Sequence, residues 1–161
     1  MFESILVPLD GSALAESALT AAVELKTKLG ARLLLVRSVE PVSHHIIGAP
    51  GMLESPATAA ANVEMIQKMT AAEREEAAAY LEAIRGRFGG GSDIETLVVE
   101  DDAPQAIVKT AVERQIGLIV MSSHGRGGLG RLVFGSVADA VLRESRVPVL
   151  LLRLEDEKKD A

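Results

Sequence analysis

Five glycines lie between serines in residues 122 to 136, SSHGRGGLGRLVFGS. The segment follows an apolar run at residues 117 to 121 and leads into a stretch with helical spacing that begins at Gly135 and Ser136. A loop that enters a helix N-terminus offers unpaired backbone N–H groups and the positive end of the helix dipole, and glycine lets the backbone approach a ligand closely. This arrangement is typical of a phosphate-binding site, so we expect a nucleotide as the ligand.

Two common nucleotide motifs do not fit this loop. The run GRGGLG from Gly125 matches G-x-G-x-x-G, but it follows the fourth expected strand, and Leu150 stands where that motif needs an acidic residue. The same run has the glycine spacing of a P-loop, but Arg131 and Leu132 replace the required lysine and the serine or threonine. The sequence therefore predicts neither a dinucleotide site nor a Walker site.

The elements that must position this loop are strands and helices, which alternate along the chain. Apolar runs predict strands at residues 5–9, 32–39, 94–99, 117–121 and 147–152. Helical spacing predicts helices at residues 13–29, 58–88, 103–115 and 136–144, and a Pro- and Gly-punctuated stretch from Glu40 to Pro56 predicts a loop or lid. Alternation of this kind predicts an α/β fold with a parallel sheet, helices on both faces and right-handed crossovers.

Composition narrows the class of protein. The chain has 161 residues, a net charge of −6, no cysteine and 2% aromatic residues. One domain of this size can bury a core without disulfides or metal, and the acidic charge and scarce aromatic residues argue against a nucleic-acid surface. The first residues form neither a signal sequence nor a membrane span. We expect a cytoplasmic protein with one domain over residues 1–153, a charged, mobile tail at 154–161, and no nucleic-acid or membrane partner.

Three segments of the chain together resemble the universal stress protein family. They are ILVPLDGS near the start, LIVMSSHGRGGLGRLVFGSVADAVLRES in the second half and VPVLLLR near the end. ATP-binding members carry Gly, two residues, Gly, nine residues, Gly, then Ser or Thr; this spacing is matched from Ser122 through Gly125 to Gly135 and Ser136, with serine in place of the first glycine. The resemblance covers nearly the whole chain and implies a single-domain, doubly wound, five-stranded parallel sheet with strand order 3-2-1-4-5.

The resemblance implies an adenine nucleotide, ATP or else AMP or ADP, in the crevice between the first and fourth strands. It implies that Asp10 lies near the adenine or ribose, that Ser38 forms the wall of the adenine pocket, and that Gly135 faces the phosphates. The cofactor-binding residues that it implies are Pro8, Asp10, Ser38, Ser122, His124, Gly125, Arg126, Gly127, Gly128, Gly135, Ser136 and Val137. From the residues alone, Asp10 and Ser136 could instead cap helices, and Ser38 could simply end a strand.

Two departures from the family pattern bear on nucleotide affinity. Ser122 puts a side chain where the family has a glycine, and Asp101 and Asp102 stand where many members have a glycine after the third strand. Carboxylates near the ribose or phosphates would repel a polyphosphate unless Mg²⁺ or Arg126 and Arg131 offset their charge.

No group of residues indicates a catalytic centre or a metal site. His124 has no partnered serine and carboxylate, which favours packing within the loop, and the adjacent His44 and His45 have no cysteine or further histidine nearby. Adenylate-forming relatives of this fold carry S-G-G-x-D-S after the first strand, whereas this chain has DGSAL from Asp10. We predict a non-enzymatic stress-response regulator; the alternatives are slow ATP hydrolysis in the same cleft and a nucleotide-free interaction module.

The last predicted strand, Val147 to Leu152, lies at a sheet edge in the strand order that the resemblance implies. A long apolar edge invites pairing with another chain unless it is covered. We therefore expect a two-fold homodimer in which the last strands pair antiparallel, as the family commonly does.

Overall fold

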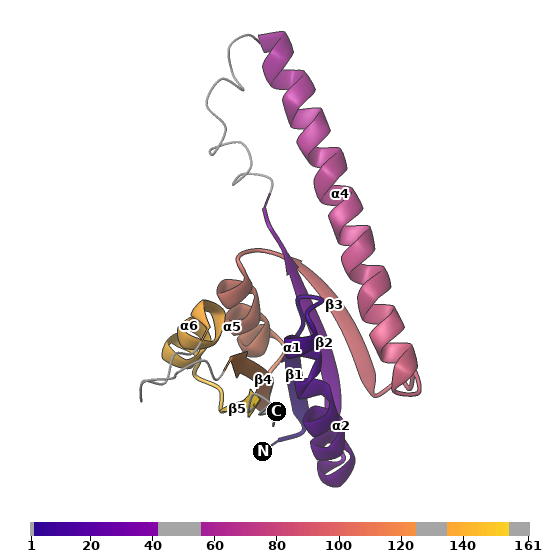
Figure 1. Cartoon of the computed structure of the whole chain (residues 1–161), viewed down its shortest axis with the longest axis vertical. Helices are drawn as coiled ribbons and strands as arrows, with labels where there is room; N and C mark the ends of the chain where they lie inside the picture. Colours follow the sequence, from indigo (N-terminus) through magenta and orange to yellow (C-terminus); the bar gives the residue numbers. More distant parts are fainter. Residues whose placement is uncertain (1, 42–55, 125–134, 155–161) are drawn as a thin grey trace, which may run out of the picture.

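A five-stranded parallel sheet forms the centre of the protein, with helices packed on both of its faces (Figure 1). The computed structural model describes residues 2–41, 56–124 and 135–154. The strands are β1 Ser4–Pro8, β2 Arg32–Val39, β3 Ile94–Glu100, β4 Leu118–His124 and β5 Val149–Leu154. They lie in the order β3-β2-β1-β4-β5, and each neighbouring pair is parallel. The predicted fold class and strand order are confirmed.

The bounds of five helices are described, and two of their ends carry clear capping residues. The helices are α1 Ala13–Glu16, α2 Ala18–Leu29, α4 Pro56–Arg87, α5 Ala103–Glu113 and α6 Ser136–Glu144. Ser12 caps α1, because its hydroxyl accepts a hydrogen bond from the Ala15 amide at 3.1 Å. Gly30 ends α2 with a φ of 64°, a left-handed conformation that glycine adopts without strain.

Most boundaries differ from the prediction by one or two residues, and three of the differences have a clear physical cause. The helix predicted at residues 13–29 is divided at Ser17, whose hydroxyl donates to the Leu14 carbonyl at 2.6 Å and so competes with the helical pattern. β4 continues through polar residues to His124 because it pairs with β5 along that whole length. β5 begins at Val149, two residues later than predicted, since Pro148 has no N–H to donate to a sheet. Residues 42–55, most of the predicted loop or lid, and the tail at 155–161 lie outside the described residues.

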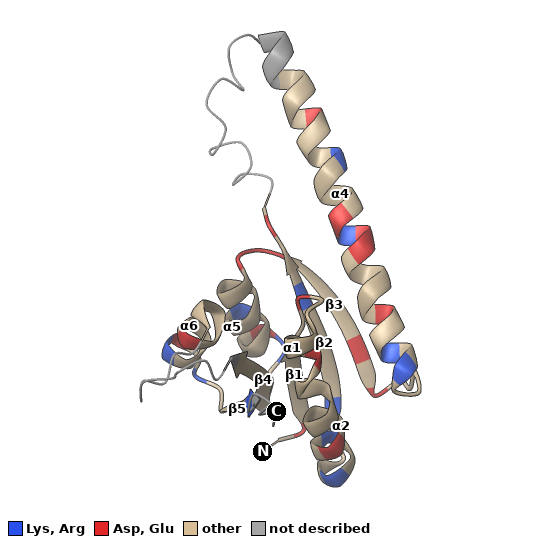
Figure 2. Cartoon of the chain, viewed as in Figure 1, with Lys and Arg blue, Asp and Glu red and all other residues tan. Residues whose placement is uncertain are grey.

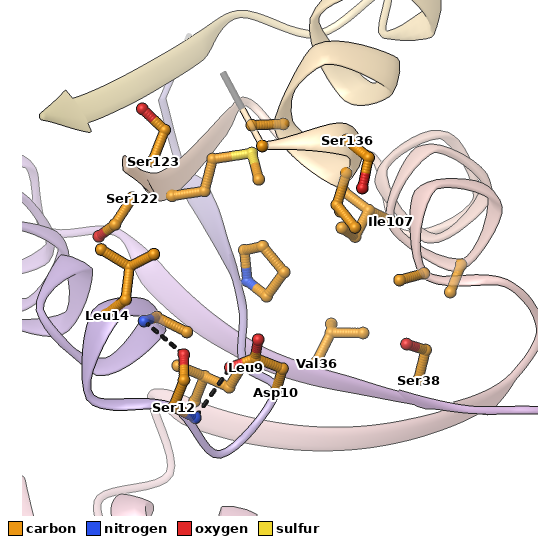
Figure 3. A pocket seen from close by; sticks show the side chains of 18 residues that line it. Leu9, Asp10, Ser12, Leu14, Val36, Ser38, Ile107, Ser122, Ser123 and Ser136 are labelled. Carbon is orange, nitrogen blue, oxygen red and sulfur yellow. Dashed lines mark hydrogen bonds between the residues drawn. The ribbon is translucent and has the colours of Figure 1, made fainter. Parts of the chain in front are cut away.

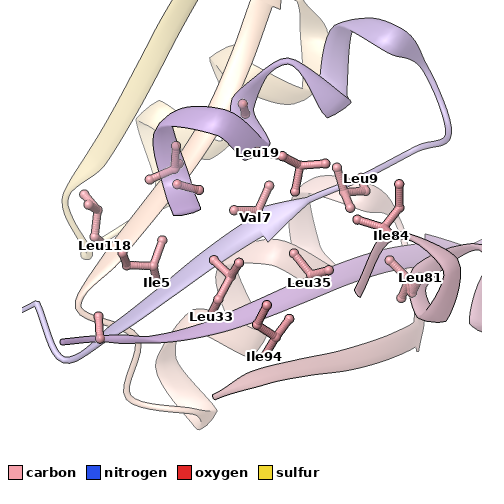
Figure 4. Close-up of a cluster of buried hydrophobic side chains, with 14 residues drawn as sticks. Ile5, Val7, Leu9, Leu19, Leu33, Leu35, Leu81, Ile84, Ile94 and Leu118 are labelled. Carbon is pink, nitrogen blue, oxygen red and sulfur yellow. The ribbon is translucent and has the colours of Figure 1, made fainter. Parts of the chain in front are cut away.

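The core has two halves, one on each face of the sheet. Side chains alternate along β1, so that Ile5 and Val7 pack toward α2 and α4 while Leu6 packs toward α5 and α6. Figure 4 shows the first half, in which Leu81 and Ile84 of α4 lie against the sheet. Because both faces are covered, the central strands are apolar almost throughout, as the sequence pattern indicated.

The longest helix, α4, extends well beyond the end of the sheet (Figure 1). Its C-terminal part is anchored by Ala77, Leu81 and Ile84, which are at most 2% exposed. Basic and acidic residues are spread along its length (Figure 2). Within the described ranges, none of the helices combines the length and the apolar character that crossing a bilayer requires.

Candidate functional site

A cleft of about 310 Å³ opens beyond the carboxyl ends of the central strands (Figure 3). Pro8 at the end of β1, Ser38 near the end of β2 and Met121 of β4 form part of its wall. The first turns of α5 and α6 close the opposite side through Ala103 and Ser136. β1 and β4 are neighbours at the point where the strand order reverses, which is where open α/β sheets bind their ligands.

The structure brings together seven of the twelve predicted site residues in this cleft. The predicted residues that line the cleft are Pro8, Asp10, Ser38, Ser122, Gly135, Ser136 and Val137. His124 ends β4, and its side chain is not part of the described structure. Gly125, Arg126, Gly127 and Gly128 fall within residues 125–134, outside the described residues. Whether any of these residues contacts a nucleotide stays a prediction.

Asp10 lies in a tight turn between β1 and α1, which we call the Asp10 turn (Asp10, Gly11 and Ser12). Its Oδ1 accepts a hydrogen bond from the Ser12 amide at 2.9 Å, and Gly11 has a φ of 88°, which favours glycine. Partial burial by itself raises the pKa of Asp10, but hydrogen bonds from Ser12 and the charge of Arg37 bring that pKa below its ordinary value. The carboxylate is therefore ionised at neutral pH and can accept hydrogen bonds from a ligand's hydroxyl groups.

The described walls of the cleft are apolar with hydroxyl groups at the rim. Val36, Ile107 and Met121 provide apolar surface, and Ser38 and Ser136 contribute hydroxyls that point toward the opening (Figure 3). Asp10 is the only charged side chain among the described lining residues. An apolar cavity with a few placed polar groups is the usual character of a small-molecule site.

The N-terminus of α6 presents backbone donors at the cleft. The first hydrogen bond within this helix runs from the Asp139 amide to the Gly135 carbonyl at 2.9 Å, so the amides of Ser136 and Val137 have no partner inside the helix. A Cβ added at Gly135 would meet no atom of the described residues within 4 Å. As far as the described residues go, the space beside Gly135 is open to a ligand, and the helix dipole favours a negative group there.

Ser122, the serine that replaces the motif glycine, turns its hydroxyl toward the junction of α1 and α2. Its Oγ lies 2.8 Å from the Oγ of Ser17, a residue that is not among those described as lining the cleft. The added side chain is thus tied to the protein rather than left free in the ligand space. The sequence showed no sign of this pair, because the two serines are 105 positions apart.

The acidic turn after β3 has its own cations. Lys109 of α5 lies 2.5 Å from Asp101, and Arg74 of α4 lies 3.4 Å from Glu100. A hydrogen bond from Lys109 to Asp101 raises the pKa of that lysine, which keeps it charged. Asp101 and Asp102 are not among the described lining residues. Lys109 and Arg74 therefore offset part of the negative charge of this turn. Arg126 and Arg131, the cations expected to offset it, are outside the described residues.

Several cleft residues were not predicted from the sequence. Ser12 was not among the predicted site residues, and neither were Ala103, Ala106 and Ile107, which form the α5 wall. Those α5 positions look like any apolar helix face, and only the packing of α5 against the sheet reveals their role. No three His, Cys, Asp or Glu side chains in the described ranges could together hold a metal ion, and His44 and His45 lie outside those ranges.

Comparison with known proteins gives a consistent result. The family model described as "Universal stress protein family" matches residues 1–153. A universal stress protein of Thermus aquaticus is 31% identical over 153 residues, which are 95% of this chain and 100% of that protein. The solved structure of MJ0577, a universal stress protein of Methanocaldococcus jannaschii, has a TM-score of 0.74 at 25% identity and covers 98% of this chain and 99% of its own. A solved universal stress protein in complex with cAMP has a TM-score of 0.60 at 23% identity, covering 96% of this chain and 98% of its own.

Proposed function

The chain belongs to the universal stress protein family, and from that membership we propose that it is a regulatory protein that binds an adenine nucleotide in the cleft between β1 and β4. The observation that carries the proposal is the convergence of Asp10, Ser38 and Gly135 on one cleft, although each comes from a different part of the chain. The resemblance implied that Asp10 lies near the adenine or ribose, that Ser38 forms the wall of the adenine pocket and that Gly135 faces the phosphates.

The chemistry of the cleft suits the three parts of a nucleotide. The apolar wall formed by Val36, Ile107 and Met121 offers a surface for the adenine ring. The ionised Asp10 carboxylate is an acceptor for ribose hydroxyls, and the amides of Ser136 and Val137 are donors for phosphate oxygens. A volume of about 310 Å³ lies within the range of small-molecule sites. The complex of a related fold with cAMP, itself an adenine nucleotide, supports the same ligand class.

The proposed role is regulation by occupancy rather than catalysis. Among the described lining residues, Asp10 is the only carboxylate, and its bonds to Ser12 favour a fixed, ionised acceptor over a proton-transfer group. Mg²⁺, if it accompanies ATP, would be held mainly by the phosphates with few protein ligands. We place the protein in the cytoplasm, as a homodimer.

The most direct experiment is the ultraviolet spectrum of the purified protein. The chain has one tyrosine and no tryptophan, so it absorbs little at 280 nm and a copurified nucleotide would dominate the spectrum. We expect a maximum near 260 nm and release of an adenine nucleotide on heating. Calorimetry with ATP, ADP and AMP should then give saturable binding to the emptied protein, and no steady-state ATP turnover with Mg²⁺.

A variant at Gly135 tests the position of the phosphates. Because the space beside Gly135 is open and its φ of −59° suits any residue, Gly135→Val should fold normally and fill the ligand space. We expect loss of nucleotide binding, whereas Gly86→Ala in α4, remote from the cleft, should bind as the wild type does. Unchanged ATP affinity in Gly135→Val would mean that the site is elsewhere, and a wild-type protein that binds no nucleotide would favour the interaction-module alternative.

A further inference from the structure

We propose that Arg37 positions the Asp10 turn for the nucleoside and that Tyr80 of α4 holds Arg37 in that place. The proposal rests on the proposed function of the cleft and adds a positioning residue and a physical connection from the site to α4. None of the residues of this connection beyond Asp10 was expected from the sequence to take part in binding.

Arg37 lies on β2 between two residues of the cleft wall, Val36 and Ser38. Successive side chains of a strand point to opposite faces, so Arg37 points to the far face of the sheet, where α2 and α4 pack. There its guanidinium lies beneath the Asp10 turn: a Cβ built on Gly11 would be 3.7 Å from Nη1 of Arg37. The turn thus has the ligand cleft on one side and a buttressing cation on the other.

The contact of Arg37 with the turn is electrostatic as well as steric. The charge of Arg37 is among the influences that lower the pKa of Asp10, beside the hydrogen bonds from Ser12. The cation therefore favours the ionised carboxylate that a ribose hydroxyl needs as acceptor. Gly11 leaves the backbone of the turn flexible. A contact from outside the turn is therefore needed to hold it in one conformation.

Tyr80 supplies a fixed platform for Arg37. The guanidinium carbon of Arg37 lies 5.0 Å from the centre of the Tyr80 ring, within the range of a cation–π contact. The Tyr80 hydroxyl donates to Oε1 of Glu16 at 3.1 Å, and Arg87 donates to Oε2 of the same carboxylate at 2.8 Å. The ring is thus held between α1 and α4, and Arg37 stacks on a surface that cannot swing away.

These contacts form a continuous chain from the cleft to α4. Asp10 faces the ligand, Arg37 lies behind the turn, and Tyr80, Glu16 and Arg87 connect that arginine to the anchored part of the long helix. A turn that is already held in its binding geometry loses less freedom when the ligand arrives, which strengthens binding. Through the same contacts, a ligand that binds in the cleft and shifts the Asp10 turn also changes how Tyr80 packs.

The first experiment measures AMP binding by calorimetry in variants of the pair. Arg37→Gln removes the cation and should weaken binding about tenfold, while Arg37→Lys should recover only part of this loss because an ammonium group does not stack as a planar guanidinium does. Tyr80→Leu should weaken binding less than Arg37→Gln does, and Tyr80→Phe, which keeps the ring but loses the bond to Glu16, should weaken binding less than Tyr80→Leu does. Arg32→Gln is the matched control, since Arg32 lies at the other end of β2.

Non-additivity distinguishes positioning from general loss of stability. If Tyr80 acts only by holding Arg37, the double variant Arg37→Gln/Tyr80→Leu should bind AMP no more weakly than Arg37→Gln alone. Additive losses, or wild-type affinity in a folded Arg37→Gln protein, would overturn the proposal while leaving the proposed function intact.

A second experiment needs no ligand. In protein with ¹³C-labelled aspartate, Arg37→Gln should raise the pKa of Asp10, and the Gly11 amide resonance should broaden as the turn loosens, with no such change in Arg32→Gln. An unaltered Asp10 pKa and Gly11 amide would show that Arg37 does not hold the turn. If the wild type binds no nucleotide, the proposed function fails. The ligand-free measurement still shows in that case whether Arg37 holds the Asp10 turn in its conformation.

Discussion

At the scale of single residues, the hydroxyl hydrogens that are already in use limit which side chains of the cleft can donate a hydrogen bond to a ligand. Ser17 has one hydroxyl hydrogen and donates it to the Leu14 carbonyl at 2.6 Å. The hydrogen between Ser17 and Ser122, 2.8 Å apart, must therefore come from Ser122. While this pair persists, Ser122 has no hydrogen left for a phosphate oxygen, so donation to a ligand falls to the backbone and to other lining hydroxyls, Ser38 and Ser136 among them.

Restoring the family glycine at position 122 should therefore cost stability rather than improve binding. We expect Ser122→Gly to lower the free energy of unfolding by about 1 to 2 kcal/mol, from the lost hydrogen bond and the freedom of glycine in a strand. ATP affinity should stay within about twofold, because the hydroxyl does not occupy the ligand space. Urea denaturation and calorimetry would measure the two effects. Ser122→Ala separates the lost bond from the backbone effect, and a tenfold gain in affinity for Ser122→Gly would show that the serine obstructs the ligand.

The pH dependence of binding should follow the lowered pKa of Asp10. The group is ionised above its ordinary value of 3.8, so its contribution to folding and to binding is present there and is lost as the pH falls through the still lower folded value. With adenosine, which has no phosphate to titrate, we expect constant affinity between about pH 5 and 8 and a decline below about pH 4, where the adenine ring also gains a proton. Asp10→Asn should bind about tenfold more weakly at pH 7 and show a smaller acid decline than the wild type, because only the adenine then titrates. Wild-type affinity in Asp10→Asn would remove the carboxylate from the site.

At the scale of helices and strands, the spacing of apolar residues in the sequence predicted the elements that bury an apolar face in the core. β2 and α6 have the predicted bounds because both show strong apolar patterns and clear ends. The polar end of β4 depends on pairing with β5, which no local pattern encodes, and the division at Ser17 depends on a hydroxyl bond to Leu14 that the apolar spacing does not reveal. For the same reason, the meeting of β1 and β4 at the cleft followed from the strand order, whereas the stacking of Arg37 on Tyr80 did not.

The contact between α1 and α4 can be measured through the single tyrosine. Burial, together with the hydrogen bond to Glu16, raises the pKa of Tyr80 to about 12. In an absorbance titration near 295 nm we expect one transition at that pH, moving toward the ordinary value in Glu16→Gln and unchanged in Glu24→Gln, where the lost partner is Lys28 on the surface. Because the folded pKa is raised, the stability due to this contact is complete below about pH 10 and is lost as the pH rises to about 12. An ordinary pKa in the wild type would contradict the contact.

At the scale of the whole molecule, the sheet leaves two edges, β3 and β5. Arg74 of α4 lies beside the end of β3 and pairs with Glu100 there. β5 carries the apolar run Val149 to Leu152, all four residues only partly buried. An edge of this kind favours pairing with a second copy, as expected from the sequence.

We predict a homodimer at micromolar concentration in analytical ultracentrifugation. Hydrogen exchange identifies the interface: on dilution toward the monomer, amides of β5 should exchange faster, while those of β3, the opposite edge, should not change. A monomer at micromolar concentration would remove the dimer, and equal changes at both edges would place the interface elsewhere.

The length of α4 makes it a lever. From Tyr80 to the first residue of the helix, Pro56, an α-helix spans about 36 Å, so a tilt of about 5° pivoting at the tyrosine displaces the far tip by about 3 Å. The pivot is next to the Arg37 stack, whereas the tip stands clear of the sheet (Figure 1). If ligand binding tilted α4 about Tyr80, a sub-ångström adjustment beside the ligand would become a displacement of several ångströms at the tip.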